Sequence, residues 1–185
     1  IVIIGAGAMG LGIAQVSAVA GYDVVLNDIA EAPLERAIAA IKKSLGKMVS
    51  KGKMAEADLD AAMAKIKTTT NLEEACKDAD LLVECVFENL ELKKDMFKKF
   101  EQYCKPETIL GTNTSAIPVT EIASATNRGD KVIGIHFMNP VPLMKGVEII
   151  RGQLTSDETM ELTLGYIEKI GKDAAIAVDF AGFIV

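Results

Sequence analysis

The chain of 185 residues is half apolar and carries 26 acidic against 20 basic side chains, which gives a net charge of −6 at pH 7. This length holds one hydrophobic core of ordinary size and is too short for two ordinary domains. Nucleic-acid binding needs a basic face, so an acidic chain of this kind predicts no nucleic-acid partner. The three cysteines, Cys76, Cys85 and Cys104, form no C-x-x-C motif. They indicate neither a disulfide framework nor a metal site, and we expect a reduced, cytoplasmic protein.

The first 28 residues predict a strand, a glycine turn, a helix and a second strand, the arrangement that binds a dinucleotide. An apolar run over residues 1–4 leads directly into a G-x-G-x-x-G motif, after which a helix-compatible segment ends before Gly21. Glycines at this spacing allow a tight turn and the approach of a diphosphate to the positive end of the helix. The predicted cofactor contacts in this turn are Gly5, Ala6, Gly7, Ala8, Met9 and Gly10.

An acidic residue in the expected place specifies the nucleotide further. Asp28 follows the second apolar strand, eighteen residues after Gly10. A carboxylate there accepts hydrogen bonds from the ribose hydroxyls and repels a 2′-phosphate. The predicted cofactor is therefore NAD rather than NADP.

A membrane span or a cleaved leader is the competing interpretation of the same stretch. No charge precedes Asp23, and Ala18-Val19-Ala20 resembles a cleavage site. Against both, no positively charged leader is present and five glycines interrupt the run by Gly21. We therefore expect no association with a membrane.

A helical hairpin is predicted after the second strand. Apolar residues at steps of three and four predict a helix from Glu31 to Lys51, Gly52 breaks it, and a second helix covers Ala55 to Lys65. The pair is decorated by Lys42, Lys43, Lys47, Lys51 and Lys53. A run of lysines is most often a solvated face. It could equally bind a phosphorylated handle of a substrate, and the residues alone leave both interpretations open.

The remainder of the chain continues to alternate. We expect strands at 66–70, 80–86, 108–111, 131–136, 146–150 and 173–178, with 146–150 as a candidate antiparallel strand, and helices at 72–76, 89–103, after Pro118 and at 155–170. This alternation predicts an α/β fold with a doubly wound, mostly parallel sheet of the Rossmann type. Ligands of such sheets bind beyond the carboxyl ends of the strands.

Polar side chains suited to catalysis follow two of these strands. The run 112–115 clusters small hydrogen-bonding groups, a pattern that occurs in turns as well as in active sites. His136, the only histidine, ends a predicted strand, and Glu148 lies in an apolar run where a carboxylate needs a partner. We predict that these two pair, because a carboxylate fixes the tautomer of an imidazole and stabilises its protonated form. A histidine placed so beside a nicotinamide is suited to act as a general base.

Taken together, these motifs make the chain similar to the NAD-binding half of the 3-hydroxyacyl-CoA dehydrogenases, and most closely to the bacterial 3-hydroxybutyryl-CoA dehydrogenases. The resemblance covers the whole chain. The run from His136 to Pro142 is far more specific than the glycine motif. The matching phrases are residues 5–10, Glu88-Asn89 with Lys93, Asn113-Thr114-Ser115, residues 136–142, Met144-Lys145, Val147-Glu148 and residues 182–185.

The resemblance implies roles for individual positions. His136 would remove the 3-hydroxyl proton while hydride passes to the nicotinamide, Glu148 would orient and support it, and Ser115 would contact the substrate oxygen near the nicotinamide. The further implied contacts are Asp28, Glu88, Lys93, Ser115 and Asn139 with NAD, and Ser44, Lys51 and Ser115 with a 3-hydroxyacyl-CoA or acetoacetyl-CoA substrate. Contacts with coenzyme A on the hairpin favour the functional interpretation of its lysines.

The resemblance also implies a domain organisation. Residues 1–181 would form the NAD-binding domain, and residues 182–185 would begin a helical domain. In the family, that following region supplies an asparagine to the active site, closes the acyl pocket and forms most of the dimer interface. We therefore expect a homodimer or larger oligomer for the full-length protein, and NAD binding with little turnover for these 185 residues alone.

Three functions stay open at this point. The first is a dehydrogenase of short-chain (S)-3-hydroxyacyl-CoA thioesters in fatty-acid oxidation or butyrate formation. The second is a dehydrogenase of a free hydroxy acid or sugar acid, which would have no nucleotide handle for the lysines to contact. The third is an NAD-binding module without catalysis, which would have no physical reason to keep Ser115, His136 and Glu148 together.

Overall fold

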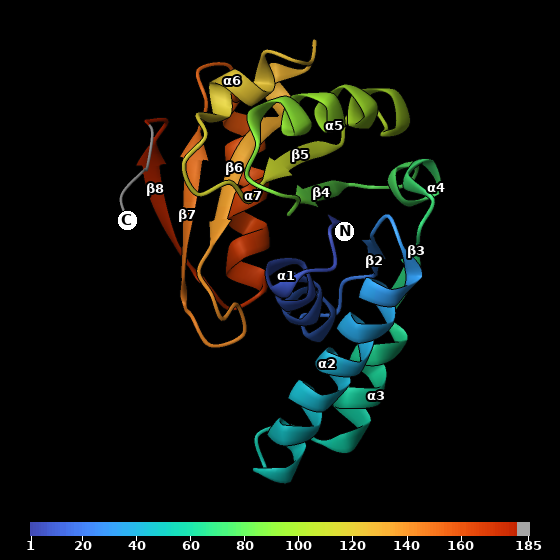
Figure 1. Ribbon diagram of the computed structural model, residues 1–185. Coiled ribbons are helices and arrows are strands. Elements are labelled where there is room, and N and C mark those ends of the chain that lie inside the picture. The colour runs from blue at the N-terminus through green and yellow to red at the C-terminus, as the bar shows by residue number, and fades with distance from the viewer. Residues whose placement is uncertain (181–185) are drawn as a thin grey trace.

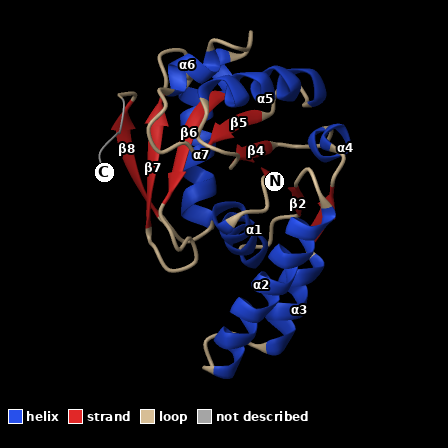
Figure 2. Cartoon of the chain, in the orientation of Figure 1, coloured by secondary structure: helices blue, strands red, loops and turns tan. Residues whose placement is uncertain are grey.

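A single mixed sheet with helices on both faces organises the chain (Figures 1 and 2). The computed structural model describes residues 1–180. The strands are β1 (Val2–Ile4), β2 (Val24–Asn27), β3 (Ile66–Thr69), β4 (Leu81–Glu84), β5 (Ile109–Thr112), β6 (Val132–Phe137), β7 (Gly146–Arg151) and β8 (Asp173–Val178). The helices are α1 (Ala8–Val19), α2 (Glu31–Ser50), α3 (Glu56–Ala64), α4 (Leu72–Cys76), α5 (Leu90–Tyr103), α6 (Val119–Ala123) and α7 (Asp157–Lys169), with a short 3-10 turn, η1 (Gly129–Lys131), before β6. The predicted start of a further domain, at residues 182–185, lies outside the described residues.

The strand order confirms the predicted fold class. The sheet runs β3-β2-β1-β4-β5-β6-β7-β8. Every neighbouring pair from β3 to β6 is parallel, β7 runs antiparallel to β6, and β8 is parallel to β7. The order reverses between β1 and β4, which is the point where doubly wound sheets bind their ligands.

Two hydrophobic cores lie on the two faces of the sheet. Successive residues of a strand point to opposite faces, so Ile3 joins one core while Val2 and Ile4 join the other. The Ile3 core is closed by α1, α2, α3 and α7, and the second core by α4, α5 and α6. Because both faces are covered, the central strands are apolar almost throughout.

The hairpin of α2 and α3 occupies the predicted position between β2 and β3. Four residues of α2 are buried, namely Leu34, Ala37, Ile41 and Leu45, whereas the five lysines of the hairpin are exposed. The hairpin projects well beyond the sheet (Figure 1). Within residues 1–180, no helix combines the length and the apolar character needed to cross a membrane.

Helix starts depart slightly from the prediction, and the caps explain where they fall. α1 begins at Ala8 rather than Leu11, because the chain enters the helix directly from the glycine turn with Gly7 as its N-cap. α7 begins at Asp157 rather than Thr155, and the Ser156 side chain accepts a hydrogen bond of 3.1 Å from the Thr159 amide. Asn71 caps α4, and its side chain accepts a hydrogen bond of 3.1 Å from the Glu74 amide.

Candidate active site

Six strands bring the predicted site segments to one edge of the sheet. The parallel strands β1, β2, β4, β5 and β6 end there, and β7 begins there because it runs in the opposite direction. The residues that follow these ends include the glycine turn, Asp28, Glu88, Ser115 and Asn139. His136 lies near the end of β6 and Glu148 near the start of β7.

The glycine turn has the shape that its sequence predicts. Gly5 has a φ of 102°, and a Cβ there would lie 2.8 Å from the Cys85 carbonyl oxygen. A Cβ on Gly10 would lie only 1.8 Å from the Gly5 carbonyl oxygen, so the start of α1 packs directly on the turn. A Cβ on Gly7, by contrast, would meet nothing within 4 Å. Gly5 and Gly10 are therefore required by the fold, and Gly7 leaves open space above the turn.

The N-terminus of α1 fits a bound diphosphate. Its N-cap, Gly7, provides no side-chain hydrogen bond, and its first turn contains no acidic residue. The first amides of a helix need partners and carry the positive end of its dipole. An anion beside Gly7 would satisfy both requirements, and a carboxylate in the first turn would have competed with it.

Asp28 is fixed at the same edge. Its Oδ2 accepts a hydrogen bond of 2.8 Å from the Ala6 amide, which ties the end of β2 to the glycine turn. A carboxylate has about four lone-pair sites, so one amide leaves capacity for the hydroxyls of a ribose. This geometry agrees with the predicted preference for NAD.

The predicted pairing of His136 with Glu148 is confirmed. The two residues are direct partners in the antiparallel register of β6 and β7, which places their side chains on the same face. His136 Nδ1 lies 2.7 Å from Glu148 Oε2, and the two side chains are 12% and 4% exposed. Among the described residues, the buried Oε1 of Glu148 has no hydrogen-bond partner. A buried carboxylate so placed fixes the orientation of the imidazole ring through Nδ1.

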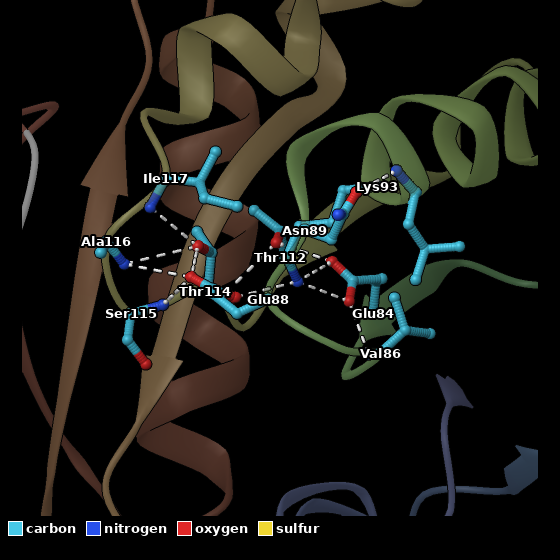
Figure 3. Close-up of polar contacts among 11 residues, drawn as sticks. Glu84, Val86, Glu88, Asn89, Lys93, Thr112, Thr114, Ser115, Ala116 and Ile117 are labelled. Atoms are coloured by element: carbon cyan, nitrogen blue, oxygen red, sulfur yellow. Dashed lines mark hydrogen bonds and ion pairs between the residues drawn. The ribbon is translucent and has the colours of Figure 1, made fainter.

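The loop that carries Ser115 is held by Glu88 (Figure 3). Glu88 Oε1 accepts hydrogen bonds from the amides of Ser115 at 3.0 Å and Ala116 at 3.3 Å, and from the Thr114 hydroxyl. Its Oε2 lies 3.3 Å from Lys93 Nζ. The exposed Ser115 directs its hydroxyl away from the Glu88 carboxylate (Figure 3).

Opposing influences act on the ionisation of Glu88. Partial burial tends to raise its pKa, but the Thr114 hydrogen bond, the Lys93 charge and the Ser115 amide together outweigh burial. The pKa of Glu88 is therefore held below its ordinary value of 4.5.

Comparison with known proteins identifies the family. Residues 1–180 match the family described as "3-hydroxyacyl-CoA dehydrogenase, NAD binding domain". The chain belongs to this family. It is 48% identical to a "Probable 3-hydroxybutyryl-CoA dehydrogenase" of Deinococcus radiodurans over 98% of the chain and 65% of that protein. It is 45% identical to a protein of the same name from Bacillus subtilis, over 100% of the chain and 64% of that protein.

Solved structures agree with this membership in the 3-hydroxyacyl-CoA dehydrogenase family. The crystal structure of (S)-3-hydroxybutyryl-CoA dehydrogenase from Ralstonia eutropha superposes with a TM-score of 0.96 at 39% identity, over 100% of this chain and 65% of that one. The chain thus spans just under two thirds of the relatives that it matches. NAD is the cofactor that the family description names.

Several polar contacts at this family's NAD-binding edge were not predicted. Glu84 and Lys93 form a buried ion pair at 2.8 Å, although the apolar run around Glu84 carries the same signal that singled out Glu148. The sequence predicts Asn113 as part of a polar cluster and of a phrase that matches the family, without a partner for its side chain. Its Oδ1 accepts a hydrogen bond of 2.9 Å from the Phe137 amide, so it joins the end of β5 to the residue after His136.

The loop after β6 carries Asn139, which is exposed and joined to Pro140 by a cis peptide bond. Lys172, which the sequence reasoning missed, holds this loop by donating to the carbonyl oxygens of Val141 at 2.7 Å and Met144 at 2.6 Å. Lys172 becomes partly buried there, and this burial lowers its pKa. The contact with NAD expected of Asn139 stays a prediction.

The predicted substrate contacts on the hairpin lie apart from the strand ends. Ser44 is half-buried on α2, and the exposed Lys51 follows the end of that helix. Their role toward a substrate stays a prediction. Across residues 1–180, no cluster of three or more His, Cys, Asp or Glu side chains is arranged to hold a metal ion. Cys76, Cys85 and Cys104 are free thiols.

Proposed function

We propose that this chain is the NAD-binding part of an enzyme that transfers hydride between NAD and C3 of a short-chain (S)-3-hydroxyacyl-CoA, with 3-hydroxybutyryl-CoA as the favoured substrate. The observation that carries the proposal is the pair of His136 Nδ1 and Glu148 Oε2, 2.7 Å apart at the edge that the glycine turn also occupies. The names of the relatives support the choice of substrate.

Different residues at this edge would bind the cofactor and transfer the proton. The turn from Gly5 to Gly10 would hold the diphosphate and Asp28 the adenosine ribose, with Glu88 and Asn139 as the further cofactor contacts. The Lys93 side chain is 1% exposed, so Lys93 would act on the cofactor only through Glu88. NAD, when bound, supplies the hydride acceptor. His136 Nε2 takes the proton of the 3-hydroxyl as the hydride leaves C3, so that a ketone is formed and the imidazole becomes protonated.

Two neighbours support this proton transfer. Glu148 stabilises the imidazolium that forms, because its carboxylate lies against Nδ1 and is almost fully buried. The Ser115 hydroxyl donates a hydrogen bond to the reacting oxygen, which favours the correct orientation of the substrate.

The remaining parts of the proposal concern partners. Ser44 and Lys51 on the hairpin would contact the coenzyme A portion of the substrate, where lysine ammonium groups favour phosphates. A homodimer or larger oligomer of the full-length protein and a cytoplasmic location are parts of the same proposal.

Steady-state NAD reduction tests the proposal. The full-length protein should reduce NAD with (S)-3-hydroxybutyryl-CoA far faster than with free 3-hydroxybutyrate, because only the thioester offers a nucleotide handle. Equal rates with both would favour a dehydrogenase of free hydroxy acids. NAD binding without turnover of either substrate would favour a binding module.

A further inference from the structure

Glu84, the last residue of β4, is a carboxylate with no exposed surface. Its two oxygens accept hydrogen bonds from the Lys93 ammonium at 2.8 and 3.0 Å. Oε1 also accepts from the Val86 amide at 2.6 Å, and Oε2 from the Thr112 hydroxyl at 2.9 Å. A carboxylate has about four lone-pair sites, so those of Glu84 are used within the protein. Whatever Glu84 contributes to function, it contributes through its neighbours.

Lys93 connects this buried carboxylate to the candidate site. It is 1% exposed, and its ammonium lies between both oxygens of Glu84 and Oε2 of Glu88. An ammonium has three donors, and three carboxylate oxygens surround this one. The Glu88 side chain is 42% exposed, and Lys93 is the cation that fixes its Oε2 while Oε1 accepts hydrogen bonds from the loop of Ser115.

We propose that Glu84 is a positioning residue for Ser115. Glu84 fixes Lys93, Lys93 fixes the carboxylate of Glu88, and Glu88 binds the amides of Ser115 and Ala116. The Ser115 hydroxyl projects from this anchored backbone, away from Glu88 (Figure 3). The inference rests on the proposed function, in which that hydroxyl contacts the reacting oxygen.

Stability alone is a weak reason for these two buried charges. A well-packed apolar pair often stabilises a fold as well as a buried ion pair does. This pair also does what an apolar pair could not do, because it directs a carboxylate at the rim of the site and binds Thr112 at the end of β5. The placement of the network, at the strand ends that line the site, is what a positioning role requires.

A double variant separates positioning from stability. Glu84→Gln/Lys93→Met in the full-length protein replaces the ion pair by neutral side chains of similar size, so no unpaired charge is buried and the variant should fold. Glu88 still loses its cation. We expect kcat/KM for the thioester to fall by about a hundredfold, the order of loss that a small misplacement causes, while the melting temperature stays close to that of the wild type. If the double variant has both the kcat/KM and the melting temperature of the wild type, the proposal is overturned.

A double-mutant cycle tests whether the chain of contacts from Glu84 through Lys93 and Glu88, here called the relay, acts on Ser115. If Glu84 acts through the Ser115 hydroxyl, Glu84→Gln will lower kcat/KM much less in a Ser115→Ala background than in the wild type, because the group to be positioned is already gone. A purely structural effect would lower kcat/KM by the same factor in both backgrounds. If the kcat/KM of the double variant falls by the product of the two single losses, the result contradicts the relay.

The chain offers a matched control. Asp80 lies immediately before β4 and pairs with Lys105 at 2.8 Å, but both side chains are exposed. Asp80→Asn removes the same charge from a lysine pair at the other end of the strand, and it should leave kcat/KM unchanged. A loss as large as that of Glu84→Gln would show that any broken acid–lysine pair on β4 has this effect, which overturns the specific role of Glu84.

Amide hydrogen exchange gives a readout that does not depend on turnover. In the Glu84→Gln/Lys93→Met variant, the amides of Ser115 and Ala116 should exchange faster than in the wild type or in Asp80→Asn. Equal exchange rates overturn the relay whatever the substrate is. If exchange is faster but the wild type oxidises no thioester, the proposed function fails and the positioning of Ser115 by Glu84 stands.

Discussion

Two acidic residues of this chain, Glu84 and Glu148, lie buried in strands and have different partners. Glu148 faces an imidazole that can gain and lose a proton, and its Oε1 has no hydrogen-bond partner among the described residues. Glu84 faces an ammonium and has a donor for each lone-pair site. The first arrangement supports a change of charge during a reaction, whereas the second keeps its charges constant.

At the residue scale, His136→Ala in the full-length protein should abolish the proton transfer without disturbing the glycine turn. We expect kcat to fall by about 10²- to 10⁴-fold, the range that a general base contributes. The dissociation constant for NAD, measured by titration, should stay nearly unchanged because the imidazole contacts the substrate. Wild-type turnover in this variant would contradict the role of His136.

The lowered pKa of Glu88 predicts how the free energy of unfolding depends on pH. Its pKa is lower in the folded protein than the ordinary 4.5, so its contribution to the free energy of unfolding is complete above pH 4.5 and is lost as the pH falls through the folded value. The difference in unfolding free energy between the wild type and Glu88→Gln should therefore be constant above pH 4.5 and shrink below it. Denaturant titrations at several pH values measure this difference. A difference in unfolding free energy that grows below pH 4.5 would contradict a lowered pKa of Glu88.

At the scale of elements, the helix N-termini differ in whether a side chain caps them and in whether their first turn is acidic. Side chains of Asn71, Asn89 and Ser156 cap α4, α5 and α7. The N-cap of α1, Gly7, offers no such group. The helices α2, α3 and α6 also lack a capping side chain, but each carries an acidic residue in its first turn, whereas α1 carries none. Since the first amides of a helix need partners, the N-terminus of α1 is the one of these four that is left open to an anion at the nucleotide edge.

Two glycine substitutions distinguish a glycine that leaves room for the diphosphate from one that the fold requires. Gly7→Ala adds a methyl group in open space, so the melting temperature should hardly change, but the methyl occupies the approach of the diphosphate and should weaken NAD binding by about 10- to 200-fold. Gly10→Ala places its methyl against the Gly5 carbonyl and should destabilise the fold by about 1–3 kcal/mol. Thermal melts and NAD titrations on both variants measure the contrast. Equal effects on NAD binding and stability in the two variants would contradict it.

The hairpin of α2 and α3 is the second element with a role of its own. Lys51→Met should raise the KM for 3-hydroxybutyryl-CoA and leave the KM for a truncated thioester without the nucleotide unchanged, because only the complete substrate reaches the hairpin. Lys98→Met, on the exposed face of α5, removes a lysine that is not near this hairpin and serves as the control. An equal rise in KM for both substrates would favour a solvated face for the lysines.

At the scale of the whole molecule, one edge of the sheet gathers segments from residue 5 to residue 148. The family relatives extend further, since this chain spans 65% and 64% of the first two compared. A surface that binds cofactor and a surface that encloses an acyl group need not lie on the same domain.

We therefore predict that the 185 residues bind NAD but turn over slowly by themselves. Binding should be close to that of the full-length protein, because the glycine turn and Asp28 are complete. Turnover of 3-hydroxybutyryl-CoA should be much slower, because the resemblance places part of the active site in the region that follows. Equal turnover by the two would show that these residues hold the whole site.

The sequence by itself determined the architecture and the edge of the sheet at which the candidate site lies. The glycine spacing, the apolar strands and their alternation with helices are local patterns, and local patterns predict a doubly wound sheet with its ligand edge. Even the pairing of His136 with Glu148 followed from local reasoning, because a carboxylate in an apolar strand needs a partner. Glu84 stands in an apolar run of the same kind, so the same argument predicts a buried partner for it as well.

Only the tertiary structure decided which side-chain contacts hold the loops at that edge in place. The resemblance implied that Lys93 contacts NAD, but its burial between Glu84 and Glu88 depends on how α5 packs on the second face of the sheet. Similarly, Asn113 reaches Phe137 because β5 and β6 are neighbours in register. Such contacts join segments far apart in the chain, and the distance between two segments is set by packing rather than by any periodicity that the sequence displays.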